Sequence, residues 1–253
     1  MAILWGPGLI MLYNDAYAVI AGAKHPRAIG RPASEAFAEI WEGIRDLLQG
    51  IMSTGAAVAL DDMPFILERH GFPEETYINA GISAIRDDTG SIGGIFISEA
   101  ESTRRVLAER RIATLSALAS EHATTTVAMA CDRALTALAT NPSDVPFALL
   151  YLLNDDGTTA RLAGSAGLES VKDGTQRDAI CPAIAPLFAP DAENATVWPL
   201  APALQGQEVV EIAVDDLETR FGANALPGGP WPESPRMALM LPLASPTQQQ
   251  PTG

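Results

Sequence analysis

The stretch 101–122, ESTRRVLAERRIATLSALASEH, constrains the fold of this chain more than any other part of its sequence. Neither proline nor glycine interrupts it, and Ser102 and Thr103 are suitable N-terminal caps. At 100° per residue its apolar side chains fall within a stripe of roughly 140°, which is wide enough for a helix that faces a partner. The stripe consists of Leu107, Ala108, Ile112, Leu115, Leu118 and Ala119. The pattern therefore predicts a connecting helix with one apolar side that must be covered.

Two kinds of partner would cover this stripe. One is a neighbouring domain, and the other is the same helix of a second chain. Arg111 and His122 interrupt the stripe, so a long regular coiled coil is not predicted. In the second interpretation the chain is a homodimer, and the contact residues of its helix are Leu107, Ile112, Leu115 and Leu118.

Length and charge set the class of protein and its expected partners. A chain of 253 residues suits one large or two ordinary domains, and its 47% hydrophobic and 19% charged residues favour folded domains. Its formal net charge is −15, from 31 acidic and 16 basic side chains. A field of that sign repels a phosphate backbone and an anionic membrane surface. We therefore expect no nucleic-acid partner and no membrane partner.

The cysteines and the N-terminal residues indicate the compartment. Cys131 and Cys181 are the only cysteines, and neither has metal-ligand spacing around it, so we expect no metal site and no disulfide framework. The apolar start, residues 1–11, has no preceding basic residue and is too short to span a bilayer. These features predict a cytoplasmic protein.

Residues 1–100 predict a small domain of mixed helix and strand. Gly6-Pro7-Gly8 is a turn between two short strands, and Asn14-Asp15 begins a short helix. Ser34 begins a longer helix that continues to Gly55. Three antiparallel strands follow, at 58–68, 76–85 and 92–98, with turns between them.

Three phrases of this region resemble a PAS sensory domain: WGPGLIMLYNDAYAVIAG, KHPRAIGRPASEAFAEIWEGI and SAIRDDTGSIGGIFISEAESTRRV. The resemblance implies that a small molecule can be held between the helices and the sheet. The candidate lining residues are Tyr13, Phe37, Trp41, Phe65 and Tyr77, and the alternative is that they fill a small core. No cofactor is expected, because residues 1–104 contain no cysteine for a flavin adduct and residues 34–54 contain no histidine for haem.

Residues 124–253 predict a second domain. A helix at 125–139 precedes the continuous apolar run 147–153, which is typical of a central strand that is buried on both sides. The phrase NPSDVPFALLYLLNDDGTTARLAGSAGL is similar to the opening of a GAF domain. In that interpretation residues 236–243 form the penultimate strand. The polar tail SPTQQQPTG has no fold-forming pattern, so we expect the GAF-like domain to be truncated at its C-terminal end.

The sequence does not predict catalysis. Ser120-Glu121-His122 faintly resembles the phospho-accepting segment of sensor histidine kinases. In that family an acidic residue follows the histidine, whereas Ala123 follows here. The sequence also contains no ATP-binding module. We therefore expect His122 to be a structural or surface histidine and this chain not to be an enzyme.

Taken together, the patterns predict an α/β (α+β) fold with two small antiparallel-sheet sensory domains joined by a helix. Their limits are 1–100 for the PAS-like domain, 101–123 for the connecting helix and 124–253 for the GAF-like domain. The chain resembles the input region of a bacterial two-component sensor histidine kinase. That resemblance implies that a signal passes through the helix to a downstream kinase domain. Three alternatives remain open: a ligand-free module for dimerisation, the input region of a phosphatase or a diguanylate cyclase, and a chain that is itself an enzyme.

Overall fold

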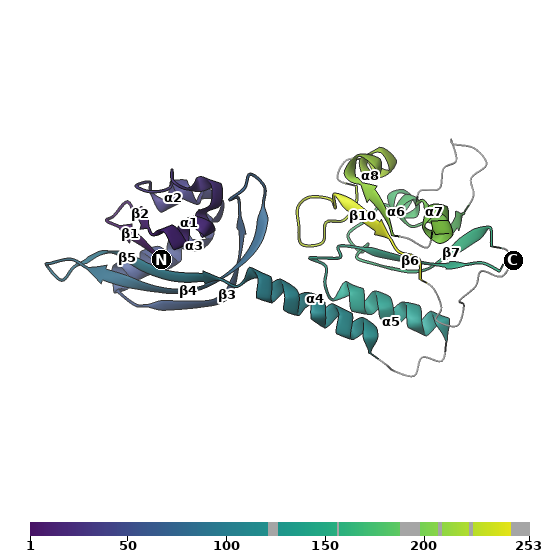
Figure 1. Cartoon of the computed structure of the whole chain (residues 1–253), viewed down its shortest axis with the longest axis horizontal. Coiled ribbons are helices and arrows are strands. Elements are labelled where there is room, and N and C mark those ends of the chain that lie inside the picture. The colour runs from purple at the N-terminus through teal and green to yellow at the C-terminus, as the bar shows by residue number, and fades with distance from the viewer. Residues whose placement is uncertain (121–125, 156, 188–197, 207–208, 223–224, 244–253) are drawn as a thin grey trace. The chain divides into compact units, whose positions relative to one another are not determined.

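The chain divides into two compact units, residues 1–110 and 111–253. The structure is a computed structural model, and it describes residues 1–120, 126–155, 157–187, 198–206, 209–222 and 225–243. The boundary between the units falls inside helix α4, Thr103–Ala119 (Figure 1). Each unit has its own hydrophobic core.

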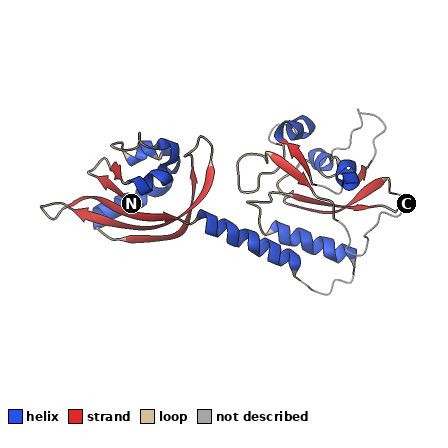
Figure 2. Ribbon diagram, in the orientation of Figure 1, coloured by secondary structure: helices blue, strands red, loops and turns tan. Residues whose placement is uncertain are grey.

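Unit 1 contains a five-stranded antiparallel sheet in the order β2-β1-β5-β4-β3. Its strands are the red arrows of the N-terminal part in Figure 2. They are β1 Ala2–Trp5, β2 Ile10–Tyr13, β3 Val58–Leu67, β4 Glu74–Arg86 and β5 Ile92–Glu101. The element order matches the one predicted from the sequence, and this mixed antiparallel architecture is consistent with a PAS-like fold.

The helices of unit 1 lie between β2 and β3 in sequence. They are α1 Asp15–Ala21, the short 3₁₀ helix η1 Gly22–Lys24, α2 Ala33–Ala36 and α3 Ala38–Thr54. The side chain of Asn14 caps α1 by accepting the N–H of Tyr17 at 3.2 Å. α3 packs against β3, β4 and β5.

The single helix predicted from Ser34 to Gly55 is broken at Phe37. The backbone of Phe37 leaves the helical region, with φ −128° and ψ 51°, and its ring is buried in the core. Its N–H still donates to the carbonyl of Ala33 at 3.0 Å, so the break leaves that donor satisfied. Burial of a large aromatic ring is the physical reason for the break, and a periodicity argument does not detect it.

The sheet of unit 1 carries its core on one face. Leu4 of β1 and Ile95 and Ile97 of β5 are buried there, in the same cluster as Phe37. Successive side chains of a strand alternate between faces, so Trp5 points to the opposite face, where it is 44% exposed.

Unit 2 contains two small antiparallel sheets. One has the order β6-β7-β8, with β6 Ala148–Leu153, β7 Thr159–Ala166 and β8 Ile184–Pro186. The other pairs β9 Val210–Ala213 with β10 Met237–Met240. The helices of unit 2 are α5 Val127–Ala139, α6 Gly174–Ile180, α7 Leu200–Gly206 and α8 Val214–Phe221.

The apolar run 147–153 was predicted to form the central strand of a sheet. Among the described residues this prediction is wrong. β6 lies at the edge of its sheet, where it pairs with β7. The predicted reason for the apolar run, cover on both faces of the strand, agrees with the contacts of β6. Helix α5 contacts β6, and Leu149 and Tyr151 pack on the core of unit 2. A strand that is covered on both faces has a continuously apolar sequence, whether it lies at the centre or at the edge of the sheet.

Across the described ranges, no helix combines the length and the apolar character that a membrane span requires.

Candidate functional site

Four of the five predicted lining residues lie in the core of unit 1. Phe37 is buried, whereas Tyr13, Trp41 and Phe65 are half-buried and pack against the same cluster. Tyr13 contacts a residue that the sequence analysis did not select, Tyr17 of α1, with ring centroids 5.0 Å apart. Phe37 meets Tyr17 edge-on at 6.4 Å. The structure thus brings an aromatic group together where the helices meet the sheet.

Tyr77 does not belong to this group. On β4 the neighbouring residues Thr76 and Ile78 are buried, and Tyr77 points to the other face of the sheet. Its hydroxyl donates to Glu75 at 2.8 Å, and its backbone N–H donates to the Thr103 hydroxyl at 3.0 Å. Tyr77 therefore lies beside the start of α4.

A carboxyl group lies next to the aromatic group. Glu99 of β5 follows Ile95 and Ile97 on the core side of the strand, where its carboxyl interacts electrostatically with the Tyr17 hydroxyl. Within the described residues its Oε1 atom is buried and has no hydrogen-bond partner. Burial raises the pKa of Glu99 from 4.5 to about 7, although the N-terminal amine and Tyr17 oppose the shift. Burial, followed by the nearby Glu99, also raises the pKa of Tyr17 well above its ordinary value.

Arg69 joins the helical side of unit 1 to the beginning of α4. Its carbonyl accepts the N–H of Ala23 at 2.8 Å, close to Gly22, where an added Cβ would lie only 2.7 Å from that oxygen. Its guanidinium donates to Glu74 at 3.1 Å and to both carboxylate oxygens of Glu101 at 2.7 and 3.0 Å. This bidentate bond lowers the pKa of Glu101.

The chain turns from β5 into α4 within this network. The hydroxyl of Thr103 donates to Glu101 at 2.7 Å, and the N–H of Ser102 donates to the Tyr77 carbonyl at 2.8 Å. About two turns further along α4, Arg110 forms a bidentate bond with Glu75 of β4 at 2.6 and 2.9 Å. The first half of α4 is therefore fixed to unit 1 by charge-assisted bonds, which are stronger than neutral ones.

Sequence reasoning missed Arg69 and Glu101. The sequence offered one signal for this pair: a basic residue, Arg69, follows β3, and an acidic residue, Glu101, ends β5. That signal is weak, because 32 residues separate the two and only the sheet register makes them neighbours.

The predicted contact residues of the connecting helix differ in exposure. Leu107 is half-buried, whereas Ile112, Leu115 and Leu118 are 61%, 65% and 42% exposed. The neighbouring Arg111 forms an ion pair with Asp144, in which its Nε lies 3.4 Å from Asp144 Oδ2. The second half of α4 thus carries an exposed apolar row, and this row is the part of the predicted stripe that needs a partner.

The core of unit 2 is centred on Trp198. The indole N–H donates to the carbonyl of Ile180 at 2.7 Å, and the ring lies 5.0 Å from that of Phe221. Cys131 and Cys181 are free and buried. The thiol of Cys181 donates to the Arg177 carbonyl at 3.0 Å, and burial raises the pKa of this thiol. A buried thiol with a raised pKa is a poor nucleophile.

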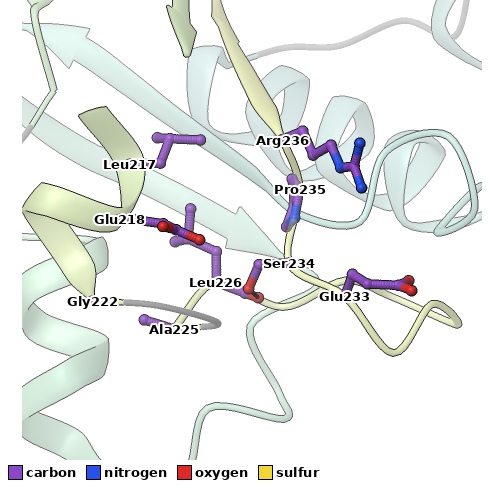
Figure 3. Close-up of a pocket in the computed structure, with 9 residues that line it drawn as sticks. All are labelled: Leu217, Glu218, Gly222, Ala225, Leu226, Glu233, Ser234, Pro235 and Arg236. Carbon is purple, nitrogen blue, oxygen red and sulfur yellow. Dashed lines mark hydrogen bonds between the residues drawn. The ribbon is translucent and has the colours of Figure 1, made fainter. Parts of the chain in front are cut away.

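A small pocket lies between α8 and the segment before β10, and Figure 3 shows the side chains that line it. Its volume is about 190 Å³, which is below the several hundred Å³ of a site for a drug-sized ligand. The hydroxyl of Ser234 already donates to the carbonyl of Leu226 at 2.7 Å. In Figure 3, the side chains of Glu233 and Arg236 extend away from Glu218 of α8. These features do not define a catalytic site.

Over the described ranges, no group of three or more His, Cys, Asp and Glu side chains is arranged to hold a metal ion. His122, considered above as a phospho-acceptor, lies outside the described residues.

Comparison with known proteins gives partial structural matches alone. No family model matches the chain, and no curated protein matches it. Among solved structures, VqmA of Vibrio cholerae is 19% identical, with a TM-score of 0.33 over 41% of this chain and 47% of that one. An RNA-binding light-oxygen-voltage (LOV) receptor is 17% identical, with a TM-score of 0.35 over 46% of this chain and 33% of that one. The light state of the Aureochrome1 LOV photoreceptor is 11% identical, with a TM-score of 0.31 over 44% of this chain and 89% of that one.

The expectation of no nucleic-acid partner must be corrected. The matched structures include VqmA, which is described with a target DNA, and a receptor that binds RNA. Net charge is a sum over the whole surface, whereas a phosphate backbone responds to the local field. A binding segment elsewhere in a longer protein is also unaffected by the charge of this region. The value of −15 therefore does not exclude a nucleic-acid partner.

Proposed function

We propose that this chain is a sensory and signal-transmission module in which unit 1 receives a signal and α4 passes it on. The observation that supports this most directly is the position of Arg69. Its backbone is bonded to the helical side of unit 1, and its guanidinium holds the strand end from which α4 begins. A shift of the helices against the sheet would therefore reach α4 through a single residue.

The two halves of α4 support the same proposal. Arg110 is bonded to Glu75 in unit 1, and the next residue, Arg111, is paired with Asp144 in unit 2. A helix that is held in both units is suited to carry a conformational bias between them. Such a module changes its output only by the difference in affinity of the signal for the two conformations. In the finer form of the proposal, the output is the kinase of a two-component sensor, because the chain resembles the input region of such proteins.

The exposed row Ile112, Leu115 and Leu118 is the proposed contact with the same helix of a second copy. Covering one half-exposed side chain of this kind contributes roughly 1 to 1.5 kcal/mol, so six of them across a symmetric pair contribute roughly 6 to 9 kcal/mol. Association costs roughly 4 to 15 kcal/mol in lost rigid-body freedom. Helix pairing by this row alone is therefore weak, and the proposed dimer should depend on concentration.

Sedimentation velocity over a range of concentrations tests the pairing. The wild type is expected to form a dimer as its concentration rises, and Leu115→Asp/Leu118→Asp to remain a monomer. The matched control is Ala113→Asp/Ala117→Asp, which adds the same charge on the opposite side of the exposed helix and should dimerise like the wild type. A monomeric wild type, or a double variant that still dimerises, would refute helix pairing.

One observation favours a second function, that of a ligand-free architectural module. The predicted lining residues Tyr13 and Phe37 pack against Tyr17, so they already fill part of the core. Native mass spectrometry of the purified chain separates the two functions. A small molecule that co-purifies with the wild type, and is lost in Phe37→Ala, supports sensing. A chain that carries no added mass supports the architectural role.

A further inference from the structure

A bulge in β3 lies beside the beginning of α4. β3 pairs regularly with β4 as far as Leu60, opposite Ala80, and pairing resumes at Met63, opposite Ile78. Two residues of β3, Asp61 and Asp62, therefore stand opposite the single residue Asn79.

Asp62 has a backbone conformation that is unusual for a residue with a side chain. Its φ is +46°, in the left-handed region that glycine adopts freely and aspartate adopts more readily than most other residues. The side chain of Asn79 stabilises this conformation, because its Oδ1 atom accepts the N–H of Asp62 at 2.7 Å. A side chain of the neighbouring strand β4 therefore stabilises the bulge.

The bulge directs the carboxylate of Asp62 to the first turn of α4. Its Oδ1 atom accepts the Ser102 hydroxyl at 2.7 Å, and both of its oxygens accept Nη2 of Arg105, at 2.5 and 2.6 Å. The carbonyl of Ser102 accepts the N–H of Val106 at 3.1 Å, so Ser102 occupies the cap position of the helix. A cap hydroxyl ordinarily accepts a helix N–H, whereas this one donates to a strand. The helix start is therefore bonded to the bulge by two residues that share one carboxylate.

We propose that the Asp62 bulge is a latch that holds the first turn of α4 against the sheet of unit 1 and releases it when the bulge relaxes. This inference rests on the proposed function, in which α4 transmits the signal. A strand changes the face that a side chain presents when its register shifts by one residue. Relaxation of the bulge would turn the carboxylate away from α4, and the bonds to Ser102 and Arg105 would break together. A contact of this kind has two discrete states, as a switch requires.

Asp62→Gly in the full chain separates the latch from a purely structural role. Glycine adopts the positive φ without strain, so the sheet is expected to remain folded while the bonds to α4 are lost. Amide hydrogen exchange, followed by mass spectrometry, should be at least about tenfold faster at residues 103–110 than in the wild type. Exchange at residues 92–98 of β5 should be unchanged.

The adjacent residue provides the matched control. Asp61→Gly removes the same charge and adds the same backbone freedom, but Asp61 is not the residue that bonds to Ser102 and Arg105. It is expected to leave exchange at residues 103–110 near the wild-type rate. Arg105→Gln, which removes the partner on the helix side, should accelerate exchange there as Asp62→Gly does.

Three outcomes would overturn the latch: unchanged exchange in Asp62→Gly, equal acceleration in Asp61→Gly, or acceleration that extends over β5. The measurement needs neither a signal nor an output domain. If the exchange experiment refutes the latch, the proposed sensory function is unaffected. If the latch is confirmed but the chain binds no signal, the sensory function is contradicted and the latch is not.

Discussion

Replacing Glu99 with glutamine is expected to remove a large part of the pH dependence of the stability of unit 1. In the wild type, burial raises the pKa of Glu99 from 4.5 to about 7, and its Oε1 atom is buried without a hydrogen-bond partner among the described residues. The folded state therefore binds a proton more tightly than the unfolded state does. The resulting stabilisation is fully present below about pH 4.5 and is lost as the pH rises through the folded pKa of about 7.

The magnitude follows from the two pKa values. Each unit of difference corresponds to 1.36 kcal/mol, so a group that titrates at about 7 when folded and at 4.5 when unfolded lowers the free energy of unfolding by about 2.5 kcal/mol between pH 5 and pH 8. This window lies above the range where Glu39 and Glu101 titrate, because hydrogen bonds lower both of their pKa values. Glutamine has the same shape but no proton to gain, so the difference between variant and wild type isolates Glu99.

Urea titrations at several pH values, read by pulse proteolysis with identification of unit 1 fragments by mass spectrometry, measure this difference. Relative to the wild type, Glu99→Gln should gain about 2.5 kcal/mol between pH 5 and pH 8. The control is Glu68→Gln, which changes an exposed glutamate of the same unit and should follow the wild type. Curves for Glu99→Gln and wild type that run parallel within about 0.5 kcal/mol would refute a buried, proton-binding Glu99.

The other predictions test the junction, the pairing and the second core. Arg69→Gln should lower the stability of unit 1 by about 2 kcal/mol or more in urea titrations, because it removes the arginine partner of two partly buried carboxylates, Glu74 and Glu101. Arg45→Gln on α3 should change the stability by less than about 0.5 kcal/mol, and equal effects would contradict a special role for Arg69. Trp198→Phe should destabilise unit 2 by about 1 to 3 kcal/mol, because the Ile180 carbonyl loses its buried donor, and an unchanged midpoint would show that this bond is dispensable. Leu115→Asp/Leu118→Asp should abolish concentration-dependent association, and Asp62→Gly should accelerate exchange at the start of α4 alone.

Much of unit 1 was predictable from local patterns. The turn at Gly6-Pro7-Gly8, the cap at Asn14 and the alternation along β5 each depend on neighbouring residues, so the sequence contains the signal for them. The strand predicted at 92–98 is observed as Ile92–Glu101, and its extra residues are the ones that lead into α4. The long helix was predicted, but its break at Phe37 was not. The Phe37 ring is buried in a core that includes residues of β1 and β5, which are distant in the sequence.

The candidate site was predictable only in part. Aromatic residues at helical and strand spacing indicated a core, and Tyr13, Phe37, Trp41 and Phe65 do lie there. Tyr77 was assigned to the same group on residue type, although its place on β4 turns it to the opposite face. Residue type alone does not fix the face of a strand, because a shift of one position reverses it.

The sequence by itself determined the order of helices and strands in unit 1, the unbroken helix from 103 to 119 and the apolar row along it, since each depends on residues close in the chain. Only the tertiary structure decided which charges meet: Arg69 with Glu101, Arg110 with Glu75, and Asp62 with Arg105. These partners are 32 to 43 residues apart, and strand register and one bulge bring them together. The free energy that selects this register comes from burial of the whole sheet, and no short stretch of the sequence encodes it.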